Sequence, residues 1–313
     1  MPGLLAVFRK EMADNFASRR FLIMFALILL AGMSATYTAA QAIRSDVASG
    51  EGSSAFVFLR LFTVSSGTLP SFVAFVGFLG PLVGLAMGFD AINGEYARGT
   101  LSRVLSNPIF RDSVINGKFL AGVSTIAVML VSIALVLAGL GLRMIGIPPT
   151  LDEVLRLFFY LVVAIFYVAF WMSLAILFSI LFRQTATSAL AGIALWILFT
   201  FFISMIAATA AQAMFPINEQ EPQTLLNHEY FRMGLSRISP TTLYQETTMT
   251  ILTPSIRSLG PVMLADVIGM VPGPLPLVQS LLVVWPQLIG LISMTLACFG
   301  FSYYRFMRQE IRA

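Results

Sequence analysis

Residues 89–118 read FDAINGEYARGTLSRVLSNPIFRDSVINGK, a long polar stretch that lies between two apolar blocks. Of the 313 residues in the chain, 58% are hydrophobic and only 11% are charged. A typical soluble domain carries about 25% charged residues. A soluble fold of this size could not bury so much apolar surface. The composition therefore predicts an all-α membrane protein in which this polar stretch meets water.

Six apolar segments are long enough to cross about 30 Å of hydrocarbon as helices. They define a single six-helix transmembrane domain over 21–313, with a polar loop at 91–117 and a longer segment at 214–276. The predicted spans are 21–42, 70–90, 118–142, 155–182, 186–213 and 277–304. The first span has features of a signal peptide, but the stretch before it is long and contains acidic residues, so we interpret it as an uncleaved helix.

Residues 1–20 are predicted to form an amphipathic helix that lies in the membrane interface. A plain extension of the first span is the alternative. The apolar residues recur every four positions on one face, and charged residues share the other face: Leu4, Phe8, Met12 and Phe16 against Arg9, Lys10, Glu11 and Asp14.

The basic residues predict the orientation. An even number of spans puts both termini on one side, together with the 91–117 loop and the turn at 183–185. Twelve of the 19 Lys and Arg residues then lie on that side. An excess of basic residues on short loops marks the cytoplasmic face. We therefore expect a multi-pass protein of the cell membrane with cytoplasmic termini, and no partner nucleic acid.

The glycines of the polar loop must be compared with a phosphate-binding P-loop. That motif places Lys and then Ser or Thr directly after its second glycine. Here Thr100 and Leu101 follow Gly99, so we expect no ATP site in this chain. A single histidine, His228, and a single cysteine, Cys298, do not predict a metal centre or a catalytic dyad. His228 is expected to be an exposed loop residue, and no catalytic residue is predicted.

The loop and its flanks resemble the permeases of the ABC-2 family. These typically read D-x-x-x-G-E-x-x-x-G-T-L, then P-x-x-R and G-K, between their second and third helices. The N-terminal FRKEMADNFASRRF and the segment 238–244 are also similar to that family. The matching positions are Asp90, Gly94-Glu95, Gly99-Thr100-Leu101, Pro108, Arg111 and Gly117-Lys118.

This resemblance implies the architecture and the partners. Such permeases have a type V exporter-like fold and are the membrane halves of ATP-driven exporters. They work as pairs with a second copy or a paralogue, and separate ATPase subunits bind ATP and Mg. The 94–108 segment would be the coupling helix that contacts the ATPase, with a smaller contact at Arg183. The implied coupling residues are Asp90, Gly94, Glu95, Arg98, Gly99, Thr100, Arg103, Pro108, Arg111, Lys118 and Arg183.

The residues of the loop fit that assignment. The run from Tyr96 to Leu105 has helical spacing, and Pro108 would stop the helix. Glu95 is expected to cap the amides of the next turn. Asp90 and Glu95 lie at the end of a span, so a structural or partner-contacting role is preferred to proton relay. The loop arginines would contact a soluble partner or, alternatively, anionic membrane lipid.

The segment 214–276 is too long for a bare hairpin and predicts a gate or a site for an extracytoplasmic partner. A short helix is expected after Pro240, capped by Thr241 or Thr242. The apolar, proline-rich residues 262–277 are expected to dip into the membrane.

Two other functions remain open at this point. One is a membrane scaffold that recruits an ATPase for maturation or signalling, as similar permeases do for the copper site of nitrous oxide reductase. The other is a secondary transporter, which the scarcity of charges within the spans disfavours. The substrate class is left open between lipid, peptide, drug and small ligand.

Overall fold

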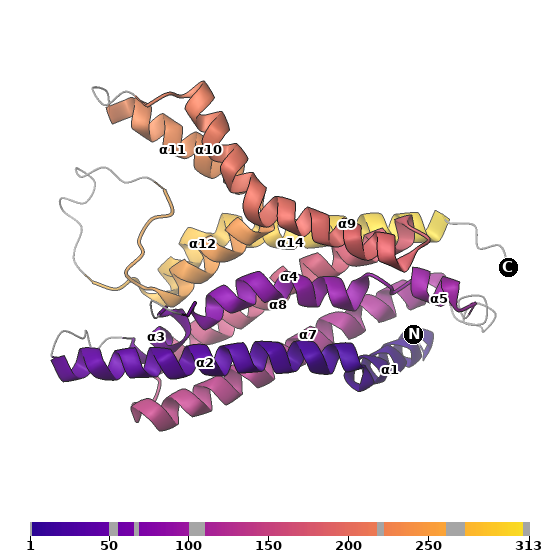
Figure 1. The fold of residues 1–313 in the computed structure, drawn as a ribbon, viewed down its shortest axis with the longest axis horizontal. Coiled ribbons are helices and arrows are strands. Elements are labelled where there is room, and N and C mark those ends of the chain that lie inside the picture. The colour runs from indigo at the N-terminus through magenta and orange to yellow at the C-terminus, as the bar shows by residue number, and fades with distance from the viewer. Residues whose placement is uncertain are drawn as a thin grey trace.

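The computed structural model describes residues 2–49, 56–65, 69–99, 110–217, 222–260 and 273–308 (Figure 1). The elements within these ranges are helices. They are α1 (Pro2–Ala17), α2 (Arg19–Ser49), α3 (Val57–Thr63), α4 (Phe72–Gly88), α5 (Asn93–Ala97), α7 (Arg111–Ile145), α8 (Leu151–Leu181), α9 (Thr185–Ile197), the π-helix η1 (Leu198–Phe202), α10 (Ile203–Met214), α11 (Pro222–Ser236), α12 (Pro240–Leu252) and α14 (Leu277–Arg308).

Six spans within the described residues are long and apolar enough to cross a membrane, which confirms the predicted all-α, six-span fold class. They are α2, α4 running on through α5, α7, α8, the continuous α9–η1–α10, and α14. The helix α7 begins at Arg111, seven residues before the expected start of its span at 118. Its first two turns are polar but helical, because they pack against α1 instead of turning away into water.

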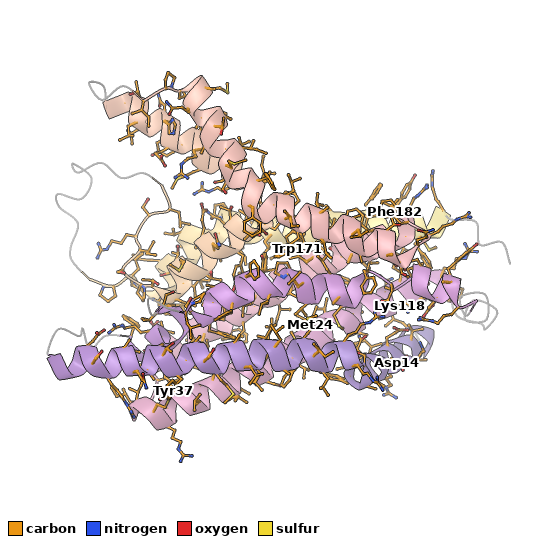
Figure 2. All side chains as sticks on the ribbon, in the orientation of Figure 1. Asp14, Met24, Tyr37, Lys118, Trp171 and Phe182 are labelled. Atoms are coloured by element: carbon orange, nitrogen blue, oxygen red, sulfur yellow. The ribbon has the colours of Figure 1, made fainter. Side chains whose placement is uncertain are left out.

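The spans lie side by side along the long axis, with α8 as the most buried of them (Figure 1). It contacts α4, α7, α9, α12 and α14. The helices α1 and α5 and the last turns of α14 gather at one end of the bundle, which we call the α5 end, and α3 lies at the other. Figure 2 shows Lys118 and Phe182 at the α5 end and Tyr37 towards the opposite end.

Glycines bring α4 into close contact with α8. A Cβ placed on Gly84 would lie 2.5 Å from the carbonyl oxygen of Val168 and 2.8 Å from the amide nitrogen of Met172. A Cβ on Gly88 would lie 2.6 Å from the carbonyl oxygen of Met172. Gly80, one turn earlier, has only 3.0 Å to a methyl of Val168. Small residues at this four-residue spacing are the usual device for tight packing between membrane helices, and they leave α4 and α8 in backbone contact.

Three tyrosines hold α12 inside the bundle. The rings of Tyr167 on α8 and Tyr244 on α12 stack with centroids 4.3 Å apart. The Tyr167 hydroxyl donates to the carbonyl of Gly77 at 2.8 Å, and the Tyr244 hydroxyl donates to Tyr160 at 3.4 Å. Each buried hydroxyl thus has a hydrogen-bond partner, so α12 can pack against α4 and α8 without leaving these hydroxyls unsatisfied.

A buried arginine joins four segments at the end opposite α5. Arg156 on α8 is fully buried and pairs with Asp152 at 2.7 Å. Its guanidinium also donates to the carbonyls of Ile251 and Leu275, at 2.8 and 2.6 Å, and to Ser280 Oγ at 3.2 Å. An uncompensated charge would be very costly here, but four hydrogen bonds from the guanidinium reach acceptors on α8, α12, α14 and the turn before α14.

The 214–276 segment differs from expectation in two places. His228 was expected to be exposed, but it lies on α11, is only 6% exposed and places Nδ1 2.9 Å from the carbonyl oxygen of Phe215. That expectation was wrong because α11 folds back along α10. The helix after Pro240 is confirmed, but Ser239 occupies its cap position, and Thr241 instead contacts Tyr167. The expected membrane dip at 262–277 falls largely outside the described residues.

The α4–α8 contact can be tested with Gly84→Ala. The added methyl would meet backbone atoms, which cannot move aside as a side chain can, so we expect a loss of about 1–3 kcal/mol of stability. The measurement is the unfolding temperature of the detergent-purified protein. Gly139→Ala on α7 is the matched control, because nothing lies within 4 Å of a Cβ there. Equal unfolding temperatures for the two variants would contradict this packing.

Candidate functional site

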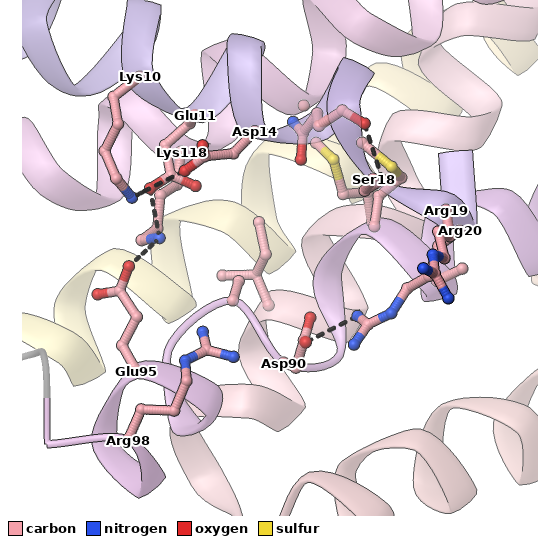
Figure 3. A pocket seen from close by; sticks show the side chains of 17 residues that line it. Lys10, Glu11, Asp14, Ser18, Arg19, Arg20, Asp90, Glu95, Arg98 and Lys118 are labelled. Carbon is pink, nitrogen blue, oxygen red and sulfur yellow. Dashed lines mark hydrogen bonds and ion pairs between the residues drawn. The ribbon is translucent and has the colours of Figure 1, made fainter. Parts of the chain in front are cut away.

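The central feature of the α5 end is a lysine held between two carboxylates (Figure 3). Lys118 Nζ on α7 lies 2.9 Å from Glu11 Oε1 on α1 and 2.7 Å from Glu95 Oε1 on α5. The three side chains are only 8%, 16% and 9% exposed. Such charge-assisted hydrogen bonds are strong where water is excluded. They connect α7 to α1 through a residue 107 positions away and to α5 through a residue 23 positions away.

The close approach of α1 to α7 places Glu11 in this cluster. A Cβ on Gly117 would lie 2.8 Å from Cγ1 of Val7, so only glycine lets α1 pack at this distance. Val7 and Glu11 are four residues apart and share the face that meets α7. The prediction that Glu11 lies on the water-facing side of α1 was therefore wrong, although Arg9 and Lys10 are exposed as expected.

The ionisation of Glu11 reflects these partners. Burial acts to raise the pKa of the Glu11 carboxyl, but Lys118 and Lys10 outweigh burial and leave that pKa below its ordinary value of 4.5. Lys10 lies 2.9 Å from Glu11 and 3.1 Å from Asp14 on the outer side of α1. Glu11 is therefore a carboxylate at neutral pH, and the attraction to Lys118 is between full charges.

The helix α5 is anchored to the end of α8. Ser179 Oγ accepts from the backbone amides of Ile92 and Asn93, at 2.9 and 3.1 Å. The Asn93 side chain donates to the carbonyl of Phe182 at 3.2 Å and accepts from Ser179 at 3.1 Å. These bonds satisfy the first amides of α5, so Glu95 is not needed as a cap. The expectation that Glu95 caps this helix was wrong, since its carboxylate binds Lys118 instead.

A second ion pair links α2 to the end of α4. Arg20 donates to Asp90 Oδ2 at 2.7 Å, and its guanidinium lies 4.9 Å from the ring centre of Phe89. Arg20 follows the break between α1 and α2, where the hydroxyl of Ser18 accepts from the amide of Phe21 at 3.2 Å and so caps α2. The capped break orients α1 across the bundle while α2 enters it.

The two glycines of the loop have different roles. Gly99 has a φ of +66°, a left-handed conformation that ends α5 and favours glycine. Gly94 has an ordinary φ, but a Cβ there would lie 3.3 Å from Cβ of Asp90 and 3.5 Å from Nη2 of Arg98. The missing side chain lets Arg98 fold back over α5 towards Asp90.

The structure brings five of the predicted coupling residues together around this site, and Gly99 ends α5 next to them. The five are Asp90, Gly94, Glu95, Arg98 and Lys118. Arg111 begins α7, and Arg183 is exposed in the turn that Asn93 holds next to α5. Thr100, Arg103 and Pro108 lie outside the described residues. Sequence reasoning missed Glu11, Arg20, Asn93 and Ser179 as members, although Glu11 and Arg20 stand in the N-terminal stretch that resembles the family.

The six long apolar helices in the described part of the chain define a multi-pass membrane protein. A family model described as ABC-2 family transporter protein matches residues 5–311, nearly the whole chain. The chain belongs to the ABC-2 transporter family.

Curated relatives match over a shorter stretch. The chain is 32% identical over 120 residues to the "Probable ABC transporter permease protein NosY" of Pseudomonas aeruginosa, covering 38% of each chain. It is 31% identical over 111 residues to the protein of the same name in Stutzerimonas stutzeri, covering 36% of this chain and 35% of the relative. The chain therefore spans little more than a third of the length of these relatives.

The Glu11–Lys118 contact predicts a pH dependence of stability. Because the folded pKa of Glu11 is depressed, its contribution is fully present above the ordinary value of 4.5 and is lost as the pH falls through the folded pKa. Glu11→Gln should therefore lower the unfolding temperature at neutral pH, and the difference from the unmodified protein should shrink below pH 4.5.

The measurement is the unfolding temperature in detergent between neutral and acidic pH. Asp14→Asn is the control, because Asp14 forms an exposed pair with Lys10 and such pairs contribute only about 0–1 kcal/mol. A constant difference between Glu11→Gln and the unmodified protein across the whole range would contradict the assignment.

Proposed function

We propose that the chain is the permease subunit of an ATP-binding cassette transporter in the cell membrane. Two permease copies form an export pathway, and separate ATPase subunits that bind ATP and Mg drive it. The observation that supports this best is the Glu11–Lys118–Glu95 cluster, which connects the short helix α5 to both α1 and α7. A segment that must transmit force needs such rigid links to the spans.

The contacts of α5 indicate how a displacement of this helix by the ATPase would be transmitted to the other helices of the bundle. The helix α5 follows α4 after a short turn and is bonded to the end of α8 through Asn93 and Ser179. The glycines of α4 leave it in backbone contact with α8. A displacement of α5 would therefore tilt α4 and α8 together and would also pull on α1 and α7 through Lys118.

The outer surface of α5 provides the docking face for the ATPase. Tyr96 projects from α5 with 41% of its surface exposed, and exposed aromatic side chains are frequent anchors at protein interfaces. The exposed turn at Arg183 lies beside it, since Asn93 bonds to the carbonyl of Phe182. Two contact points on one cytoplasmic surface suit a groove in a soluble subunit. In this proposal the start of α1 and the end of α14 face the same cytoplasmic side.

The second copy would meet the chain at α4 and α9. The span α9–η1–α10 is the most exposed of the six. It touches α4 where the rings of Phe78 and Trp196 meet with centroids 5.2 Å apart. The π-helix η1 bends this span, and α10 and α11 lean away from the bundle as a hairpin at the end opposite α5 (Figure 1). That hairpin is the proposed contact for an extracytoplasmic partner or gate.

Docking on α5 can be tested with Tyr96→Ala. Removing the exposed ring should reduce co-purification of the ATPase subunit about tenfold or more, since an aromatic anchor contributes upwards of about 1–2 kcal/mol to an interface. The assay uses tagged permease expressed with its ATPase in the native host. Tyr37→Ala is the control, because Tyr37 is 51% exposed but lies far from α5. Equal recovery of the ATPase with both variants would refute docking on α5.

Transmission through the cluster can be tested with Glu95→Gln. This change keeps the shape and leaves Lys118 paired with Glu11, so the fold should persist while the α5–α7 link weakens. We expect the ATPase to remain bound and its stimulation by the permease to fall about fivefold, as a charged hydrogen bond becomes neutral.

The matched control is Glu229→Gln, which alters a more exposed ion pair with Arg232 on α11. Its ATPase stimulation should be unchanged. Full stimulation in Glu95→Gln, with the ATPase bound, would show that the cluster has no part in coupling.

A further inference from the structure

A cavity of about 400 Å³ opens between α1, α2, α4 and α7 at the α5 end (Figure 3). Its inner surface is apolar and includes Met87, Met172 and Ile176. Its rim is charged and includes residues of α1, the start of α2 and α5. A site with a charged rim over an apolar floor suits an amphipathic ligand better than a fully polar one.

The charges on the rim do not balance locally. Every carboxylate that lines the cavity already has a basic partner within 3.1 Å: Glu11 and Asp14 with Lys10, Glu11 and Glu95 with Lys118, and Asp90 with Arg20. Two further lining residues, Arg19 and Arg98, have no carboxylate at ion-pair distance among the described residues. The cavity is thus lined by five basic and four acidic side chains, which leaves one surplus positive charge.

The two arginines reach the cavity from opposite sides. Figure 3 shows Arg98 on one side and Arg19 with Arg20 on the other, with Asp90 between them. Arg98 folds back over Gly94, with Nη2 3.5 Å from the position of a Cβ on that glycine. Arg19 begins α2 directly after the break at Ser18. Two guanidinium groups facing one space are suited to an anion with several oxygens, because each can donate a fork of two hydrogen bonds.

We place the cavity at the depth of lipid headgroups, because its charged residues flank the apolar runs of two spans. Arg19 and Arg20 immediately precede the apolar run of α2, and Asp90 follows the apolar run of α4. Basic pockets between membrane helices at this depth bind the phosphate groups of anionic lipids. We propose that Arg19 and Arg98 bind a phosphate-bearing anion in this cavity, the headgroup of an anionic phospholipid or a soluble phosphoanion. Its tail, where it has one, would lie along the apolar floor.

The experiment uses the purified full chain without any ATPase, so its result is independent of the proposed coupling. The protein is placed in nanodiscs of equimolar phosphatidylcholine and phosphatidylglycerol, extracted again in detergent, and its retained lipids are counted by native mass spectrometry. We expect preferential retention of phosphatidylglycerol by the unmodified chain. Arg19→Gln/Arg98→Gln should lower that preference about tenfold or more, since each lost charged hydrogen bond is individually strong.

A second arm adds inorganic phosphate to lipid-depleted protein and follows the unfolding temperature. Stabilisation of the unmodified chain by phosphate, lost in the double variant and without any lipid preference, would identify a soluble phosphoanion as the ligand. Arg19→Lys/Arg98→Lys should retain part of either response. Arg9→Gln, which removes an exposed charge of α1 that does not line the cavity, should change neither. Unchanged responses in the glutamine double variant, or equal losses with Arg9→Gln, would overturn the proposal.

Discussion

The placement of one ammonium group between two carboxylates determines how the α5 end is built. Lys118 is nearly buried, and a buried charge is tolerated only when its partners are fixed close to it. Glu11 precedes Lys118 by 107 residues and Glu95 precedes it by 23, so α1 must cross α7 and α5 must fold back towards α7. Because Gly117 has no side chain, α1 can pack closely against α7 and bring Glu11 to Lys118. The hydrogen bonds between Asn93 and Ser179 hold α5 on α8 and so fix the position of Glu95 next to Lys118.

The spans were predictable from sequence because hydrocarbon imposes a length and a composition on each of them. The polar side chains were less predictable. Arg156 lies within the predicted span 155–182, and it is fully buried because α12 and the turn before α14 bring carbonyls to it from residues 95 and 119 positions away. His228 was misjudged for the same reason: its burial depends on α11 folding along α10. Neither environment has a local signature in the sequence.

At the candidate site, too, the residues were predictable from the sequence but their long-range contacts were not. Asp90, Glu95 and Lys118 were identified from their resemblance to a family pattern, but their partners were not. Glu95 was expected to cap its own helix, which is a local interaction. The competing long-range interaction with Lys118 is stronger, because both groups are charged and water is largely excluded. Local rules predict caps well when no buried opposite charge is within reach, and at this site one is.

The residues of the Glu11–Lys118–Glu95 cluster also line the cavity. The proposed coupling and the proposed anion binding are therefore linked thermodynamically. A motion of α5 that changes the separation of Arg98 from Arg19 would change the affinity of the cavity for an anion. By reciprocity, an anion in the cavity would then favour one position of α5 by the same free energy. An anionic lipid would in that case act on the coupling segment without touching the ATPase, and the strength of the effect would be limited by the difference in its affinity for the two positions of α5.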